Sequence, residues 1–268
     1  MSEVTDPLTD FERRAIMIGG VTHDVFIAGT GPAVLVIPEV PGITPDVADC
    51  SRRLVEAGFS AWMPSLYGEP GVPFTNGRAL KTIVKACISR QFLAFARGAR
   101  APKVDWLREL GRQAHDECGG PGIGVIGMCF TGNFALALAI DERVKVPVMS
   151  QPSLPLGRDK KSAAALHVAP DDLAKVKQRT VDDELCVIGL RFTGDVLVPE
   201  ARFRSLEREF GEAFIGVEID SSAGNEWGFA KDAHSVTSKE WSPDLENPTG
   251  QAWQLIVDHL NDQLLATS

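Results

Sequence analysis

The stretch GIGVIGMCFTGNFALALAI, residues 122–140, decides the fold class, because it places a tight turn between a buried strand and a helix. Residues 122–127 are apolar without alternation, which is typical of a parallel strand covered on both faces. An alanine-rich helical pattern starts at Asn133. The glycines, together with Pro121 and Asn133, favour this interpretation over a membrane span, although residues 119–140 carry no charge.

Short apolar runs alternate with helical patterns on both sides of this turn. Strands are predicted at 33–38, 59–64, 122–127, 144–150, 184–192 and 214–220, and helices at 46–58, 104–120, 133–144, 169–179, 199–211 and 247–265. A hairpin is expected over 15–29, with Gly19 and Gly20 at its turn. This alternation predicts a mostly parallel, doubly wound α/β sheet with helices on both faces and ligands at the carboxyl ends of the strands.

No repeat or linker composition interrupts the pattern, so residues 1–268 are expected to form a single domain. The least regular part is 65–105, where a Gly/Pro-rich loop precedes an amphipathic helix over 78–100. This segment is expected to be a lid or a long connection.

Composition excludes several classes of function. The chain has 27 Lys and Arg against 36 Asp and Glu, and its net charge of −9 argues against binding to nucleic acid or to an anionic membrane. The first residues contain acids and no apolar core, so no signal peptide is expected. The cysteines lack metal-ligand spacing, and cofactor motifs are missing, so we expect a reduced, cytoplasmic protein without metal or cofactor. Its oligomeric state is not readable.

Cys129 is the candidate nucleophile. It lies in Gly127-Met128-Cys129-Phe130-Thr131-Gly132, the position of the strained strand-to-helix turn that holds a nucleophile in front of a helix N-terminus. A thiolate would be stabilised there. On the motif alone, a small buried cysteine without function is an equally good interpretation.

Two further residues follow in the chain order of a hydrolase triad. Asp195 comes after the strand predicted at 184–192, and His234 lies in a loop after the strand predicted at 214–220. Nucleophile, acid and histidine in this order, each at the carboxyl end of a strand, form the α/β-hydrolase arrangement. Asp195 would orient the imidazole and His234 would transfer the proton. The other histidines fit structural roles better: His23, His115, His167 and His259.

Glu39 ends the strand predicted at 33–38, in the loop that normally supplies an oxyanion-hole N–H in this fold. There its carboxylate would lie near Cys129 and act as a base or hydrogen-bond partner of the thiol. A solvent-exposed loop glutamate is the alternative.

Together these motifs resemble the dienelactone hydrolase family: Cys in G-x-C-x-x-G, Glu in P-E-x-x-G, an acid after G and the pair H-S. The resemblance extends from about Val34 to the last helix. It implies an α/β-hydrolase fold, a triad of Cys129, His234 and Asp195, and a Glu39 that helps to deprotonate Cys129 when substrate binds. It also implies an oxyanion hole built from the backbone N–H groups of Val40 and Phe130.

The sequence departs from the family where a substrate carboxylate would bind. Ser238 stands four residues after the histidine, where the family typically has an arginine, and Lys239 follows. Arg90 is the best candidate for the second substrate-binding arginine and Arg78 the next, while Trp227 is a candidate pocket wall. An arginine grips a carboxylate better than a lysine. The expected substrate is therefore a small ester or lactone, anionic if Arg90 lines the site, rather than dienelactone itself.

Three alternatives stay open at this point. A Glu after an early strand with an elbow Cys is also the pattern of DJ-1/PfpI-like proteins, which act on reactive carbonyls. The fold could instead serve a non-catalytic small-molecule binding protein. In a structural protein, Cys129 would be an inert core residue.

Overall fold

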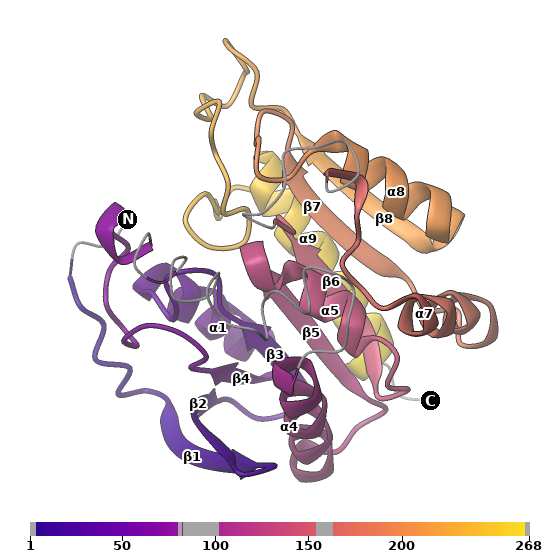
Figure 1. Cartoon of the computed structure of the whole chain (residues 1–268). Helices are drawn as coiled ribbons and strands as arrows, with labels where there is room; N and C mark the ends of the chain where they lie inside the picture. Colours follow the sequence, from indigo (N-terminus) through magenta and orange to yellow (C-terminus); the bar gives the residue numbers. More distant parts are fainter. Residues whose placement is uncertain (1–3, 80–81, 83–101, 154–162, 266–268) are drawn as a thin grey trace.

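The computed structural model describes residues 4–79, 82, 102–153 and 163–265 (Figure 1). Within these ranges one eight-stranded sheet has the order β1-β2-β4-β3-β5-β6-β7-β8. The strands from β4 to β8 in this order are parallel, while β1 and β2 are antiparallel additions at one edge. Their bounds are β1 Glu12–Ile18, β2 Val21–Ala28, β3 Ala33–Ile37, β4 Ser60–Pro64, β5 Ile123–Met128, β6 Val144–Ser150, β7 Val187–Phe192 and β8 Phe214–Ile219. The predicted α/β-hydrolase-type sheet is confirmed.

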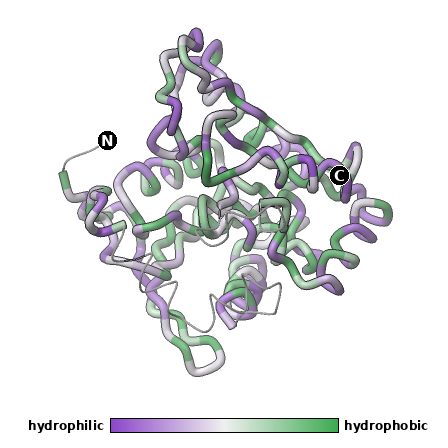
Figure 2. Tube along the Cα trace, turned by 45° about the horizontal axis from the view of Figure 1, so that its top comes forward, coloured by the Kyte–Doolittle hydropathy of each residue, from purple (hydrophilic) through white to green (hydrophobic). Residues whose placement is uncertain are grey.

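Helices cover both faces of the sheet. They are α1 Pro45–Glu56, α4 Pro102–Cys118, α5 Gly132–Leu138, α7 Pro170–Asp182, α8 Glu200–Phe210 and α9 Pro248–Leu260. Buried residues of α4, α5, α7 and α8 pack on one face, and those of α1 and α9 pack on the other (Figure 1). Every residue of β3 and β5 is consequently buried. Figure 2 shows hydrophobic segments along the middle of the molecule, as two-sided burial requires.

Local signals place the helix ends. The hydroxyl of Thr44 accepts a hydrogen bond from the backbone N–H of Val47, and Pro45 occupies the first turn of α1. Asn247 caps α9 in the same way, with Pro248 next. The predicted closing helix is confirmed over 247–265, because a turn of π-helix at Asn261–Leu265 continues α9.

The hairpin turns at Gly19 and Gly20 as predicted, and both residues have positive φ angles, 59° and 79°. Strand β1 begins earlier than expected, because Glu12 pairs with Ile27 and Arg14 with Val25. Charged residues are tolerated there because β1 is an edge strand with one side open.

One predicted helix is too long. The pattern predicts a helix over 133–144, but α5 ends at Leu138. The guanidinium of Arg179 donates hydrogen bonds to the carbonyls of Ala139 and Val144, at 2.6 and 3.1 Å, and so stabilises a turn between α5 and β6. A contact between residues so far apart in the chain leaves no mark on local periodicity.

The predicted insertion falls largely outside the described residues. Residues 76–79 are helical, whereas 80–81 and 83–101, which include Arg90, lie outside. Among the helices that the structure describes, none has the length and apolarity needed to cross a membrane.

Candidate active site

Cys129 lies directly after β5, in a short 3-10 turn that leads into α5. Its φ angle is 53°, a left-handed conformation that is costly for a residue with a side chain. The turn also requires two glycines. A Cβ on Gly127 would lie 2.3 Å from the carbonyl oxygen of Thr131, and one on Gly132 would lie 2.8 Å from the Cα of Pro152. The backbone therefore has the form of a nucleophile elbow.

Thr131 stands where the usual elbow motif has its second glycine, and it connects the turn to β3. Its buried hydroxyl accepts a hydrogen bond from the N–H of Met128 at 3.0 Å and donates one to the carbonyl of Ile37 at 2.8 Å. The end of β3 and the loop that carries Glu39 are thereby held against the elbow. This role of Thr131 is not visible in the elbow motif, because its partner Ile37 lies 94 residues away in the chain.

His234 and Asp195 form a hydrogen-bonded pair. The Nδ1 atom of His234 lies 2.6 Å from Oδ2 of Asp195, while Oδ1 accepts a hydrogen bond from the N–H of Leu197 at 2.9 Å. Asp195 is 4% exposed. Burial opposes protonation of the ring, but the charge of Cys129 and the hydrogen bond to Asp195 together hold the pKa of His234 well above its ordinary value.

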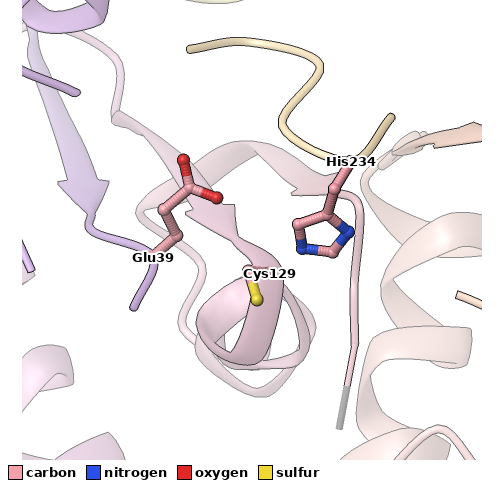
Figure 3. A group of neighbouring side chains, drawn as sticks. All are labelled: Glu39, Cys129 and His234. Carbon is pink, nitrogen blue, oxygen red and sulfur yellow. The ribbon is translucent and has the colours of Figure 1, made fainter. Parts of the chain in front are cut away.

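Cys129, Glu39 and His234 converge from three different loops (Figure 3). One side-chain heteroatom of each lies within 4.8 Å of the others. The described contacts do not form a closed Cys-His-Asp hydrogen-bond chain, and Sγ of Cys129 contacts Oγ of Ser153 at 3.1 Å instead. Within the described part of the chain, Nε2 of His234 is buried and has no hydrogen-bond partner. The ring nitrogen that could receive the thiol proton is thus close to the sulfur and not engaged by another described group.

Glu39 is 7% exposed, so the interpretation as a solvent-exposed loop residue is wrong. Its Oε1 atom accepts a hydrogen bond from the hydroxyl of Ser238 at 2.6 Å. Its Oε2 atom accepts from the hydroxyl of Ser235 at 2.7 Å and from Nε2 of Gln151 at 3.2 Å. Ser238, which replaces the arginine expected from the family, is therefore a direct partner of this carboxylate. Among the described residues the hydrogen-bond partners of Glu39 are all neutral.

The loop that carries His234 is anchored by Arg53 of α1. The guanidinium donates a hydrogen bond to the carbonyl of Thr237 at 2.5 Å. It also lies over the rings of Trp241 and Trp253, at 3.8 and 4.7 Å from their centroids. Cation–π contacts of this kind are strongest where water is excluded. Residues 234–238 are consequently held by α1, whose buried residues belong to the same core cluster as Val236.

The structure does not bring the predicted substrate-binding residues together with Cys129, Glu39 and His234 among the described contacts. Arg90 lies outside the described residues, and Arg78 is exposed and donates to the carbonyl of Pro73 at 3.1 Å. Trp227 is 39% exposed, and none of the described ring contacts involves it. Phe130 packs edge-on against Phe134 and is 4% exposed, so these rings belong to the core beside the elbow.

Comparisons with known proteins agree with this fold. The family model described as "Dienelactone hydrolase family" matches residues 24–264. A putative dienelactone hydrolase from Klebsiella pneumoniae subsp. pneumoniae has a similar structure, with 17% identity, coverage of 92% of this chain and 96% of that one, and a TM-score of 0.61. A dienelactone hydrolase-like promiscuous phosphotriesterase from metagenomic libraries has 17% identity, coverage of 95% and 98%, and a TM-score of 0.61. No curated protein matches the sequence.

Proposed function

Because the chain belongs to the dienelactone hydrolase family, we propose that it hydrolyses small carboxylic esters or lactones through a thioester on Cys129. One observation carries the proposal. The sulfur of a left-handed elbow cysteine lies within 4.8 Å of an imidazole nitrogen, and the other nitrogen of that imidazole is held by a buried aspartate. This geometry supports the roles of nucleophile, proton acceptor and orienting acid for the three residues, in the order that acyl transfer needs.

In the first half-reaction, the thiol proton passes to Nε2 of His234 as Sγ bonds to the substrate carbonyl carbon. The resulting oxyanion accepts hydrogen bonds from the backbone N–H groups of Val40 and Phe130, each worth about 3–4 kcal/mol in other enzymes. The C–O bond of the ester then breaks, and the proton on Nε2 moves to the leaving alkoxide. Asp195 stabilises the imidazolium throughout.

In the second half-reaction, His234 takes a proton from water, and the hydroxide attacks the thioester carbonyl. The S–C bond breaks, the acid product leaves, and the proton returns to the Cys129–His234 pair. Glu39 provides a second acceptor for the thiol proton when substrate binds. This role agrees with its burial and its position beside Cys129.

The test uses Cys129→Ala together with Cys186→Ala as a matched control. Cys186 is a half-buried cysteine at the start of the β7 region, with its sulfur 3.8 Å from the carbonyl of Glu184. With activated aryl esters, Cys129→Ala should lose turnover while its circular dichroism stays unchanged, and Cys186→Ala should retain full activity. Iodoacetamide should label Cys129 in the native protein. Wild-type turnover in Cys129→Ala would exclude the thioester mechanism.

Family membership favours this hydrolase over a Glu-Cys enzyme acting on reactive carbonyls. A non-catalytic binding protein of the same fold is the remaining alternative. It predicts no turnover over a panel of esters and lactones and no effect of Cys129 alkylation on ligand binding.

A further inference from the structure

Gln151 is the residue through which the separate loops of the site are connected. It follows β6 directly and is fully buried, and its N–H donates to the carbonyl of Leu190 in β7 at 2.8 Å. Its φ angle is +35°, so a residue with a long side chain occupies a backbone conformation that favours glycine. Such strain persists only where the surroundings impose it, and it is often found at functional sites.

The orientation of the Gln151 amide follows from its partners. Its Oε1 atom accepts a hydrogen bond from the backbone N–H of Val236 at 3.2 Å and a short one from the hydroxyl of Ser150. A backbone N–H can only donate, so the oxygen must face Val236. The amide nitrogen therefore faces Glu39, with Nε2 at 3.2 Å from Oε2. This nitrogen can only donate, and it holds the Glu39 oxygen in the role of acceptor.

The same short segment also reaches the nucleophile. The N–H of Ser153 donates to the carbonyl of Cys129 at 2.9 Å, and its hydroxyl lies 3.1 Å from the sulfur. Arg202 of α8 secures the segment by donating to the carbonyl of Pro152 at 2.6 Å. Residues 150–153 thus contact the elbow, the Glu39 loop and the His234 loop at once.

We propose that Gln151 is a positioning residue that fixes Glu39 and the His234 loop relative to Cys129. Its amide oxygen holds the backbone two residues after His234, and its amide nitrogen donates to Glu39, whose carboxylate is turned toward Ser235 and Ser238. The strained backbone aims the side chain between the two loops. The inference rests on the proposed hydrolase function and adds a residue that touches neither the substrate nor the reacting sulfur.

Two variants test it, with Ser60→Ala as the control. Gln151→Met keeps the length of the side chain and removes both polar ties. Ser60 lies in β4, is buried, and accepts a hydrogen bond from Nε1 of Trp62 at 3.1 Å. Ser60→Ala therefore also removes one buried side-chain hydrogen bond, but away from the site. Steady-state kinetics on an activated aryl ester and thermal unfolding are measured for all three proteins and the wild type.

Gln151→Met should lower kcat by about tenfold or more, as expected for the loss of a hydrogen bond to a charged group, and should change KM less than about twofold. Ser60→Ala should lower Tm with kcat unchanged. A Gln151→Met kcat within about threefold of wild type, or no lower than that of Ser60→Ala, would overturn the inference.

Gln151→Glu provides a second readout if Gln151→Met fails to fold. It keeps the shape and the acceptor for Val236, but its other oxygen can donate to Glu39 only when the two carboxyl groups share a proton. Glu39 is the ionisable group in direct contact with this side chain, and Cys129 and His234 lie beyond it. The kcat of Gln151→Glu relative to wild type should therefore rise as pH falls from about 8.5 to about 5.5. A ratio of one at every pH would refute the positioning role. Ester turnover that does not require Cys129 would instead count against the proposed function.

Discussion

Asp195→Asn is the change that separates a working triad from a chance arrangement of these residues. The carboxylate now accepts two hydrogen bonds, one from the N–H of Leu197 at 2.9 Å and one from Nδ1 of His234 at 2.6 Å. An asparagine has one acceptor oxygen, so it can serve only one of these donors. If the oxygen stays with Leu197, the amide NH2 faces Nδ1 and selects the tautomer with its proton on Nε2. That tautomer cannot receive the thiol proton of Cys129.

The same replacement in a serine-protease triad lowers kcat by about 10⁴ through the wrong tautomer. We expect a loss of about 10³–10⁴ here, which corresponds to about 4–5.5 kcal/mol at about 1.36 kcal/mol per factor of ten. The loss should fall on the acylation burst, because the first proton transfer is the step that is blocked. KM should change little.

The assay is stopped-flow release of an aryl alcohol, with Asp172→Asn as the control. Asp172 is a similarly buried aspartate in α7, with Oδ2 at 3.2 Å from the guanidinium of Arg108 and no place in the site. Its replacement should lower Tm and leave the burst rate unchanged. A burst rate of Asp195→Asn within about tenfold of the wild type would refute the triad and leave Glu39 as the base to examine.

Two further predictions concern stability. Phe203 is fully buried and packs edge-on against Phe214 at 5.6 Å, so Phe203→Ala should lower the free energy of unfolding in urea by about 3–5 kcal/mol. The control Val196→Ala, at an 86% exposed site, should have almost no effect. A loss below about 1 kcal/mol for Phe203→Ala would contradict the packing. The raised pKa of His234 means that the folded state favours the imidazolium. The free energy of unfolding of the wild type should therefore exceed that of His234→Gln by its full amount below about pH 6.5, and this excess should decrease as pH rises through the folded pKa. An excess that grows with pH would contradict the direction of the shift.

Much of the fold was predictable because it depends on local patterns. The strands β3 and β5 are apolar on both sides, and the glycines around Cys129 are dictated by backbone contacts as short as 2.3 Å. Periodicity failed where a distant side chain decides the boundary, as Arg179 does at the end of α5. The sequence pattern also gave no indication that the exposed guanidinium of Arg78 donates a hydrogen bond to the carbonyl of Pro73.

For the site, the sequence alone indicated the types and the chain order of Cys129, Asp195 and His234, because each follows a strand whose apolar run is visible locally. Only the tertiary structure decided what holds them. Glu39 is bound by two serines about 200 residues away and by Gln151, whose role has no sequence motif. The reason is physical: parallel strands bring their carboxyl ends together from remote parts of the chain, and a side-chain hydrogen bond across that edge depends on distance and angle rather than on spacing along the chain.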